Sequence, residues 1–142
     1  MTLAPSKFIH GSPQVAAYLR SHGITPTLQR IRIGEALFAK AQHVSAEQVL
    51  SMVNKENEEV SKATVYNTLG LFASKGLLHE VVIEASKVFY DTNLDKHHHL
   101  YHIDTGVLED ISANQVKIGQ LPELPDGTIL EDVDVIIRLR KS

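Results

Sequence analysis

The sequence predicts an α+β protein whose N-terminal part is a winged helix-turn-helix domain. Apolar residues recur at helical spacing in four segments before Gly76, and the pattern then changes to the alternation of β-strands. Helices followed by a two-stranded hairpin are typical of a winged helix-turn-helix. A histidine-rich run at 97–102, His-His-His-Leu-Tyr-His, then predicts a further strand that ends at an Asp-Thr-Gly turn.

The composition is that of a soluble globular protein, long enough for one domain or two small ones. Of the 142 residues, 43% are hydrophobic and 22% are charged, and none is cysteine. Without cysteine the chain has no disulfides, no cysteine-bound structural zinc and no thiol redox sensing. It has no apolar run of about 18 residues and no signal-peptide pattern, so we expect a cytoplasmic protein without a membrane span.

Local signals mark the first two helices. Ser12 and Pro13 are expected to be the N-cap and the first residue of a helix that Gly23 ends. Thr27 is expected to cap a second helix, in which apolar residues recur from Leu28 to Phe38. The sequence therefore predicts two helices joined by a short turn.

Two further helices and a hairpin follow. Ser45-Ala-Glu-Gln48 has the pattern of a capping box at the start of a third helix. Ser61 is expected to open a fourth helix, which carries an apolar stripe and ends at Lys75-Gly76. Alternation over 78–83 and 87–90 then predicts a β-hairpin, which would be the wing.

In a winged helix-turn-helix the fourth helix would enter the major groove of DNA, with its N-terminal end against bases and phosphates. Candidate contacts on this helix and on the second are Lys62, Thr64, Tyr66, Asn67, Thr27, Gln29 and Arg30. Threonine can touch a thymine methyl group, and asparagine can pair with adenine. The net charge of −3 means that DNA contacts must use a local patch. The same residues also suit an ordinary helix surface, and the pattern alone leaves both interpretations open.

The histidine run offers ligands for a divalent metal. Successive side chains of a strand point to opposite faces, so His97 and His99 share one face and His98 shares the other with His102. The nearby acids are Asp91, Asp95, Asp104, Glu109 and Asp110. Mixed imidazole and carboxylate ligation suits Mn, Fe, Zn or Co. Strand histidines that are merely solvated are the alternative.

Taken together, these motifs resemble the ferric uptake regulator (Fur) family. Four segments carry the resemblance, in the family's order and over nearly the whole chain: His43-Val-Ser-Ala-Glu47, Lys62-Ala-Thr-Val-Tyr-Asn-Thr-Leu69, Val88-Phe-Tyr-Asp91 and His97-His-His99. The triple histidine, Asn67, the 120–127 segment and the ending at 133–140 resemble the iron response regulator (Irr) branch.

The resemblance implies a dimeric DNA-binding transcriptional regulator of iron-related genes, not an enzyme. Residues 1–91 would form the winged-helix DNA-binding domain, and 92–142 a small α/β domain for dimerisation and metal sensing. The partners would be a second copy of the chain and an AT-rich, double-stranded operator. A small hydrolytic metalloenzyme is the alternative class, but the chain has no helical His-Glu-x-x-His, nucleophile elbow or phosphate loop.

Carried over position by position, the resemblance assigns the regulatory metal site to His43, Asp91, His97, His99 and Asp110. Asp110 stands where the family usually has glutamate. His43 and Asp91 belong to the DNA-binding part and the other three to the dimerisation part. One bound ion of Mn, Fe or Zn would therefore fix the hinge between the two parts.

The opposite strand face would supply a second metal site, or haem ligation, through His98, His102 and Asp132. The family's other acid aligns poorly, near Lys117, so we expect this site to be degraded or repurposed. His102 and Thr105 stand where many relatives have a zinc-binding Cys-x-x-Cys pair, so structural zinc is not expected. The dimer would instead depend on packing of an alternating strand at 133–139.

Two modes of signalling stay open. An Irr-like protein would respond to metal or haem and would bind DNA after metal removal. A Fur-like or peroxide-sensing repressor would need Mn or Fe in order to bind DNA. The same residues fit both modes.

Overall fold

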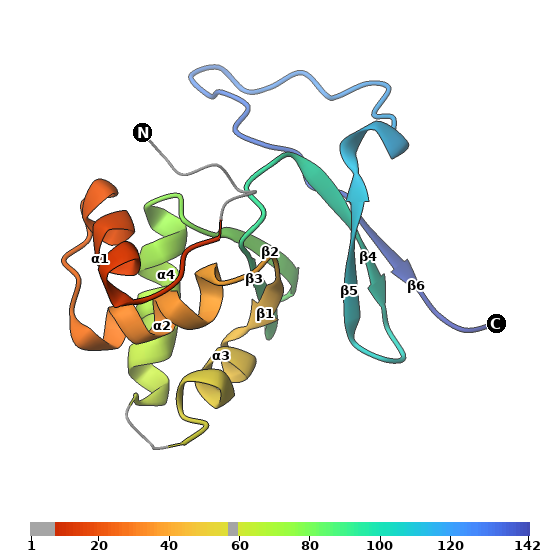
Figure 1. Ribbon diagram of the computed structural model, residues 1–142. Coiled ribbons are helices and arrows are strands. Elements are labelled where there is room, and N and C mark those ends of the chain that lie inside the picture. Colours follow the sequence, from red (N-terminus) through yellow and green to blue (C-terminus); the bar gives the residue numbers. More distant parts are fainter. Residues whose placement is uncertain (1–7, 57–59) are drawn as a thin grey trace. The chain divides into compact units, whose positions relative to one another are not determined.

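The computed structural model describes residues 8–56 and 60–142, and the chain divides into two compact units after Leu94. The division lies slightly beyond the boundary predicted at residue 91. Figure 1 labels the helices and strands of both units. Among the described helices, none has the length and apolar character needed to cross a membrane.

The first unit combines helices with a small sheet. Its helices are α1 (Ser12–Ser21), α2 (Leu28–Phe38), α3 (Ala46–Val53) and α4 (Lys62–Ser74), and its strands are β1 (His43–Ser45), β2 (His79–Glu84) and β3 (Lys87–Asp91). The strand order is β1-β3-β2, with antiparallel pairing throughout. β2 and β3 form the predicted wing hairpin. β1 was not predicted, because a three-residue strand is too short to show alternation.

The predicted starts of α2, α3 and α4 are confirmed by hydrogen bonds at their caps. The hydroxyl groups of Thr27, Ser45 and Ser61 accept hydrogen bonds from the backbone N–H groups of Arg30, Gln48 and Thr64, respectively. At α3 the Gln48 side chain also accepts from the Ser45 N–H, which completes the predicted capping box. These bonds satisfy N–H groups that have no partner within the helix.

The predicted cap of α1 is wrong. The helix begins at Ser12 itself, and Gly11 stands at the N-cap without a side-chain hydrogen bond. The Ser12 hydroxyl instead donates to the carboxylate of Glu35 on α2, at 2.7 Å. The Ser12 hydroxyl, which the local sequence assigns to capping, is therefore bonded to a residue of another helix. The predicted stop at Gly23 is confirmed. Gly23 has a φ of 73° and lies just after His22, the C-cap residue of α1.

The apolar stripe of α4 builds the core of the first unit. Val65, Leu69 and Phe72 are completely buried, and α4 packs against α2 and α3. Burying each such side chain contributes about 1.5–3 kcal/mol to stability. The opposite side of α4 stays in solvent and carries Lys62 and Tyr66. One face of this helix therefore holds the fold, and the other is available for binding.

The second unit is a three-stranded sheet of order β5-β4-β6. Its elements are β4 (His97–His102), β5 (Val107–Ser112), the 3-10 turn η1 (Ala113–Gln115) and β6 (Ile136–Leu139). β4 and β5 are antiparallel and are joined by the predicted turn, where Gly106 has a φ of 74°. β6 runs parallel to β4 and covers part of the predicted 133–139 strand. Residues 116–135 contain no helix or strand.

Candidate metal centre and nucleic-acid interface

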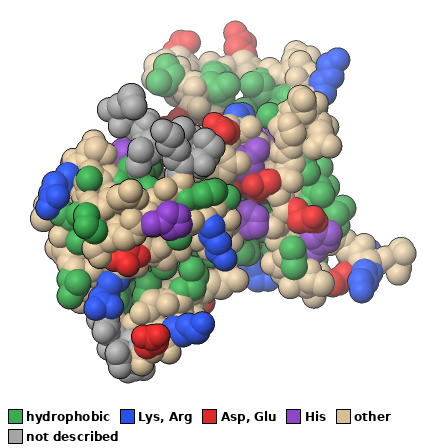
Figure 2. Space-filling model, in the orientation of Figure 1, with side chains coloured by type: hydrophobic (Ala, Val, Ile, Leu, Met, Phe, Trp, Pro, Cys, Tyr) green, Lys and Arg blue, Asp and Glu red, His purple; other side chains and the backbone are tan. Residues whose placement is uncertain are grey.

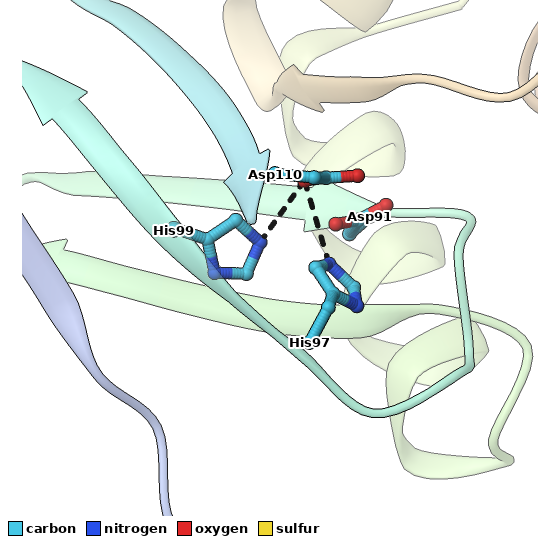
Figure 3. Close-up of side chains that lie close together, drawn as sticks. All are labelled: Asp91, His97, His99 and Asp110. Carbon is cyan, nitrogen blue, oxygen red and sulfur yellow. Dashed lines mark ion pairs between the residues drawn. The ribbon is translucent and has the colours of Figure 1, made fainter. Parts of the chain in front are cut away.

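Two imidazoles of β4 converge on one carboxylate of β5. His99 is the register partner of Asp110, and antiparallel partners project from the same face of a sheet. His97 lies on that face as well, two residues earlier along β4. The Nε2 atoms of His97 and His99 are each 3.4 Å from Oδ1 of Asp110, as the dashed lines in Figure 3 mark. The predicted sharing of a face by His97 and His99 is therefore confirmed.

A backbone carbonyl orients the His97 ring. Its Nδ1 atom lies 2.6 Å from the carbonyl oxygen of Asp95, which can only accept a hydrogen bond. Nδ1 therefore carries the proton, and in the neutral ring Nε2 presents a lone pair toward Asp110. Metal-binding histidines are usually oriented in this way, by a carbonyl or carboxylate on the other ring nitrogen. The local structure thus prepares Nε2 of His97 as a ligand atom.

The three side chains fit a divalent cation. Each of His97, His99 and Asp110 offers one ligand atom within 4.8 Å of the other two. Both imidazoles are buried, at 7% and 0% exposure, so that little water competes for them. Two nitrogens and one carboxylate oxygen suit Mn, Fe or Zn. Three protein ligands leave coordination positions that water or further residues would fill.

The two remaining candidate ligands lie side by side in the first unit. His43 on β1 is the register partner of Asp91 on β3, so both project from one face of that sheet. Asp91 is only 1% exposed, and its carboxylate accepts a 2.9 Å hydrogen bond from the N–H of Asn93.

Sequence reasoning missed His79, the first residue of β2. It pairs with Asp91 from the other side and completes a row of three potential ligands across the sheet. The only signal in the sequence was a histidine at the start of the wing.

The residues predicted for a second site each hold a separate partner. His98 is buried, and its Nδ1 accepts a 3.1 Å hydrogen bond from the N–H of Val135. Burial lowers the pKa of His98, and the positive charge of Lys96 lowers it further. Asp132 binds the Lys96 ammonium at 2.5 Å, while His102 pairs with Glu109. The structure therefore gives no convergence of His98, His102 and Asp132.

Lys96, which directly precedes β4, places its ammonium against the acidic segment before β6. Its ammonium also contacts the carbonyl oxygen of Val133 and lies 3.7 Å from Asp134. Three oxygens thus surround one lysine ammonium. This arrangement places a fixed positive charge where the sequence predicted a degraded or repurposed cation site.

The candidate DNA contacts lie on the exposed side of α4 and at the start of α2. Lys62, Tyr66 and Asn67 are exposed, as are Thr27 and Gln29, while Thr64 and Arg30 are partly buried. Gln29 and Lys62 line one surface depression together with Ser61 at the cap of α4. The start of α2 and the start of α4 therefore contribute to one surface.

The two partly buried candidates, Thr64 and Arg30, hold local hydrogen bonds. The Thr64 hydroxyl accepts a 2.9 Å hydrogen bond from the Ser61 hydroxyl, and the Arg30 guanidinium donates to the carbonyl oxygen of Thr25. On the face shown in Figure 2, lysine and arginine side chains are interspersed with acids and do not form one continuous patch. Binding to DNA would therefore depend on local contacts, as the net charge of −3 indicates.

Comparison with known proteins gives a consistent result. A sequence model described as the Ferric uptake regulator family matches residues 21–136. A ferric uptake regulation protein of Cupriavidus metallidurans is 35% identical over 111 residues, which cover 73% of this chain and 78% of that protein. The peroxide-responsive repressor PerR of Staphylococcus aureus is 28% identical over 108 residues, 76% of this chain and 73% of that one.

A solved structure agrees with these matches. The manganese-containing structure of the ferric uptake regulator of Pseudomonas aeruginosa has a TM-score of 0.67 and 25% identity. The match covers 89% of this chain and 97% of that one. The similarity thus extends over both units.

Proposed function

The chain belongs to the ferric uptake regulator family, and we propose that a divalent metal bound by its histidines and aspartates sets its affinity for operator DNA. The protein is a metal-responsive transcription regulator, from a family of regulators and not of enzymes. Proteins of this family bind DNA and are dimeric. We propose that the partner subunit is a second copy of this chain, that the operator is AT-rich double-stranded DNA, and that the regulator acts in the cytoplasm.

The proposed ligands are His43, Asp91, His97, His99 and Asp110. The observation that carries this proposal is the convergence of two buried imidazoles on the Asp110 carboxylate. The pairing of His43 with Asp91 in the first sheet supports the other two. Because the two sets belong to different units, an ion bound by both would restrict the orientation of one unit relative to the other. A dimer binds two half-sites only when its recognition helices have the matching separation.

For the signal, we propose the Irr mode, in which metal or haem modulates a protein that binds DNA without metal. The triple histidine at 97–99 and Asn67 support this mode. His98, His102 and Asp132 are the proposed residues for a second ion or for haem, and each would have to leave the separate partner that it holds in this structure. The second candidate is a repressor that requires Mn or Fe, as a Fur or peroxide sensor would; the similarity to the Staphylococcus aureus PerR favours it.

The test is DNA binding by protein in defined states of loading. Anisotropy of a labelled promoter fragment is measured with chelator-treated, Mn-loaded and haem-loaded protein. Binding by chelator-treated protein that haem reverses supports the Irr mode, and binding only after addition of Mn supports the second candidate. His99→Ala should remove the metal response, whereas the exposed His10→Ala should retain it. Absence of binding in all three states would contradict the proposed function.

A further inference from the structure

Glu47, in the first turn of α3, contacts both large polar side chains on the exposed face of α4. The Tyr66 hydroxyl donates a 2.8 Å hydrogen bond to Oε1 of Glu47, and Nζ of Lys62 lies 3.4 Å from the same oxygen. The Lys62 Nζ atom is also 5.8 Å from the centroid of the Tyr66 ring. The three side chains therefore form one contact group on the surface that we propose faces DNA.

The position of Glu47 follows from the fold around it. The capping box at Ser45 starts α3, which leaves Glu47 in a first turn where the helix dipole favours a negative charge. α3 packs against α4, so this carboxylate meets the first two turns of the neighbouring helix. Hydrogen bonds from Tyr66 and Lys62 lower the pKa of Glu47. The Glu47 carboxyl is therefore an anion at neutral pH.

An anion on this surface has two effects on DNA binding. It neutralises the lysine that would otherwise contact a phosphate, and it repels the DNA backbone directly. The side chains of Lys62 and Glu47 are 65% and 61% exposed, so their ion pair is weak and easily exchanged for another partner. A phosphate at the right place can therefore replace the carboxylate. A duplex that forms no base contacts with α4 gains less from that exchange.

We infer that Glu47 is a specificity-determining residue. In the free protein it holds Lys62 and Tyr66. It releases both side chains fully only on DNA where base contacts made by α4 offset the lost contacts between Glu47 and these two residues. The inference rests on the proposed DNA-binding function and extends it from affinity to selectivity. It predicts that removing the negative charge strengthens binding to arbitrary DNA more than binding to the operator.

The test uses full-length, Mn-loaded Glu47→Gln, which keeps the side-chain length and an oxygen that can accept from Tyr66. Dissociation constants are measured for an operator duplex and a random-sequence duplex over a series of salt concentrations. The affinity for random DNA should rise about threefold, from the loss of one exposed ion pair. For the random-sequence duplex, the slope of log affinity against log salt should steepen by about 0.9, the value of one added phosphate contact. The ratio of operator to random affinity should fall.

Two further variants complete the test. Glu131→Gln removes the same charge from an exposed position in the second unit and should change neither slope nor ratio. Tyr66→Phe removes the hydrogen bond but keeps the carboxylate, so the salt slope should stay as in the wild type. An unchanged slope and ratio in Glu47→Gln, or an equal effect of Glu131→Gln, would overturn the inference. Wild-type protein that binds neither duplex in any metal state would instead refute the proposed function on which the inference rests.

Discussion

His99 of β4 lies directly opposite Asp110 of β5, with its Nε2 atom 3.4 Å from the aspartate Oδ1. The register of one strand pair thus creates the contact. A shift of that register by one residue would carry every side chain of β4 to the other face. The turn that ends at Gly106 therefore controls the metal chemistry, because it sets which acid meets the buried imidazoles.

Asp110→Asn should lower the affinity for Mn²⁺ by at least about tenfold, because the amide keeps the shape of the side chain but loses the charge. Calorimetric titration of chelator-treated protein measures this affinity. Asp126→Asn, an exposed turn position in the same unit, is the matched control and should bind as the wild type does. Equal affinities for the two variants would remove Asp110 from the ligand set.

Ser61→Ala should destabilise the first unit by about 1 kcal/mol, because the N–H of Thr64 loses its acceptor at the start of α4. Urea unfolding followed by circular dichroism measures the change. Ser51→Ala replaces an exposed serine within α3 that caps nothing, and it should leave stability equal or slightly higher. If both variants lose stability equally, the cap is not the cause.

Asn67→Ala should weaken operator binding by about 1–3 kcal/mol if the amide pairs with an adenine in the major groove. Its affinity for a random-sequence duplex should be unchanged, since an uncharged side chain adds little to backbone attraction. Competition binding with single base-pair changes in the operator should then locate one position at which the variant no longer discriminates. A uniform loss on both duplexes would indicate a structural defect instead.

Tyr66→Phe should raise the pKa of Glu47 toward its ordinary value of 4.5, because the Tyr66 hydroxyl is the main group that lowers it. A carboxyl whose folded pKa lies below its unfolded value adds stability above the unfolded pKa. That contribution is lost as the pH falls through the lowered folded value. The wild type should therefore lose this contribution to stability below about pH 4.5. In Tyr66→Phe the contribution should be smaller, so stability should fall less over the same pH range. Carbon-13 NMR titration of the Glu47 carboxyl provides the measurement, and identical titration curves would contradict the assigned hydrogen bond.

Lys96→Met should loosen the strand β6, because the ammonium holds Asp132 and the Val133 carbonyl just before that strand. Amide hydrogen exchange in β6 should become about two- to fivefold faster, as expected from losing partly exposed ion pairs. Exchange in β5 should not change. The control is Lys117→Met, an exposed lysine of the same unit, and an equal effect of both variants would argue for a general loss of charge.

Features that depend on neighbouring residues were predictable from the sequence. The caps at Thr27, Ser45 and Ser61 each involve residues within three positions, and all three are present. The shared face of His97 and His99 follows from strand geometry alone. Where a distant residue competes, the local rule fails. Ser12 bonds to Glu35 rather than capping its own helix, and no local pattern indicates that choice.

The sequence by itself determined the starts of α2, α3 and α4, the wing and the supply of imidazoles, because each is encoded within a few residues of chain. Only the tertiary structure decided that Asp110 meets His99 directly, that His79 joins His43 and Asp91 in one row, and that Glu47 contacts Tyr66. These contacts arise from strand register and from the packing of one helix on another. Both bring together residues that are far apart in the chain, so their partners are set by the whole fold.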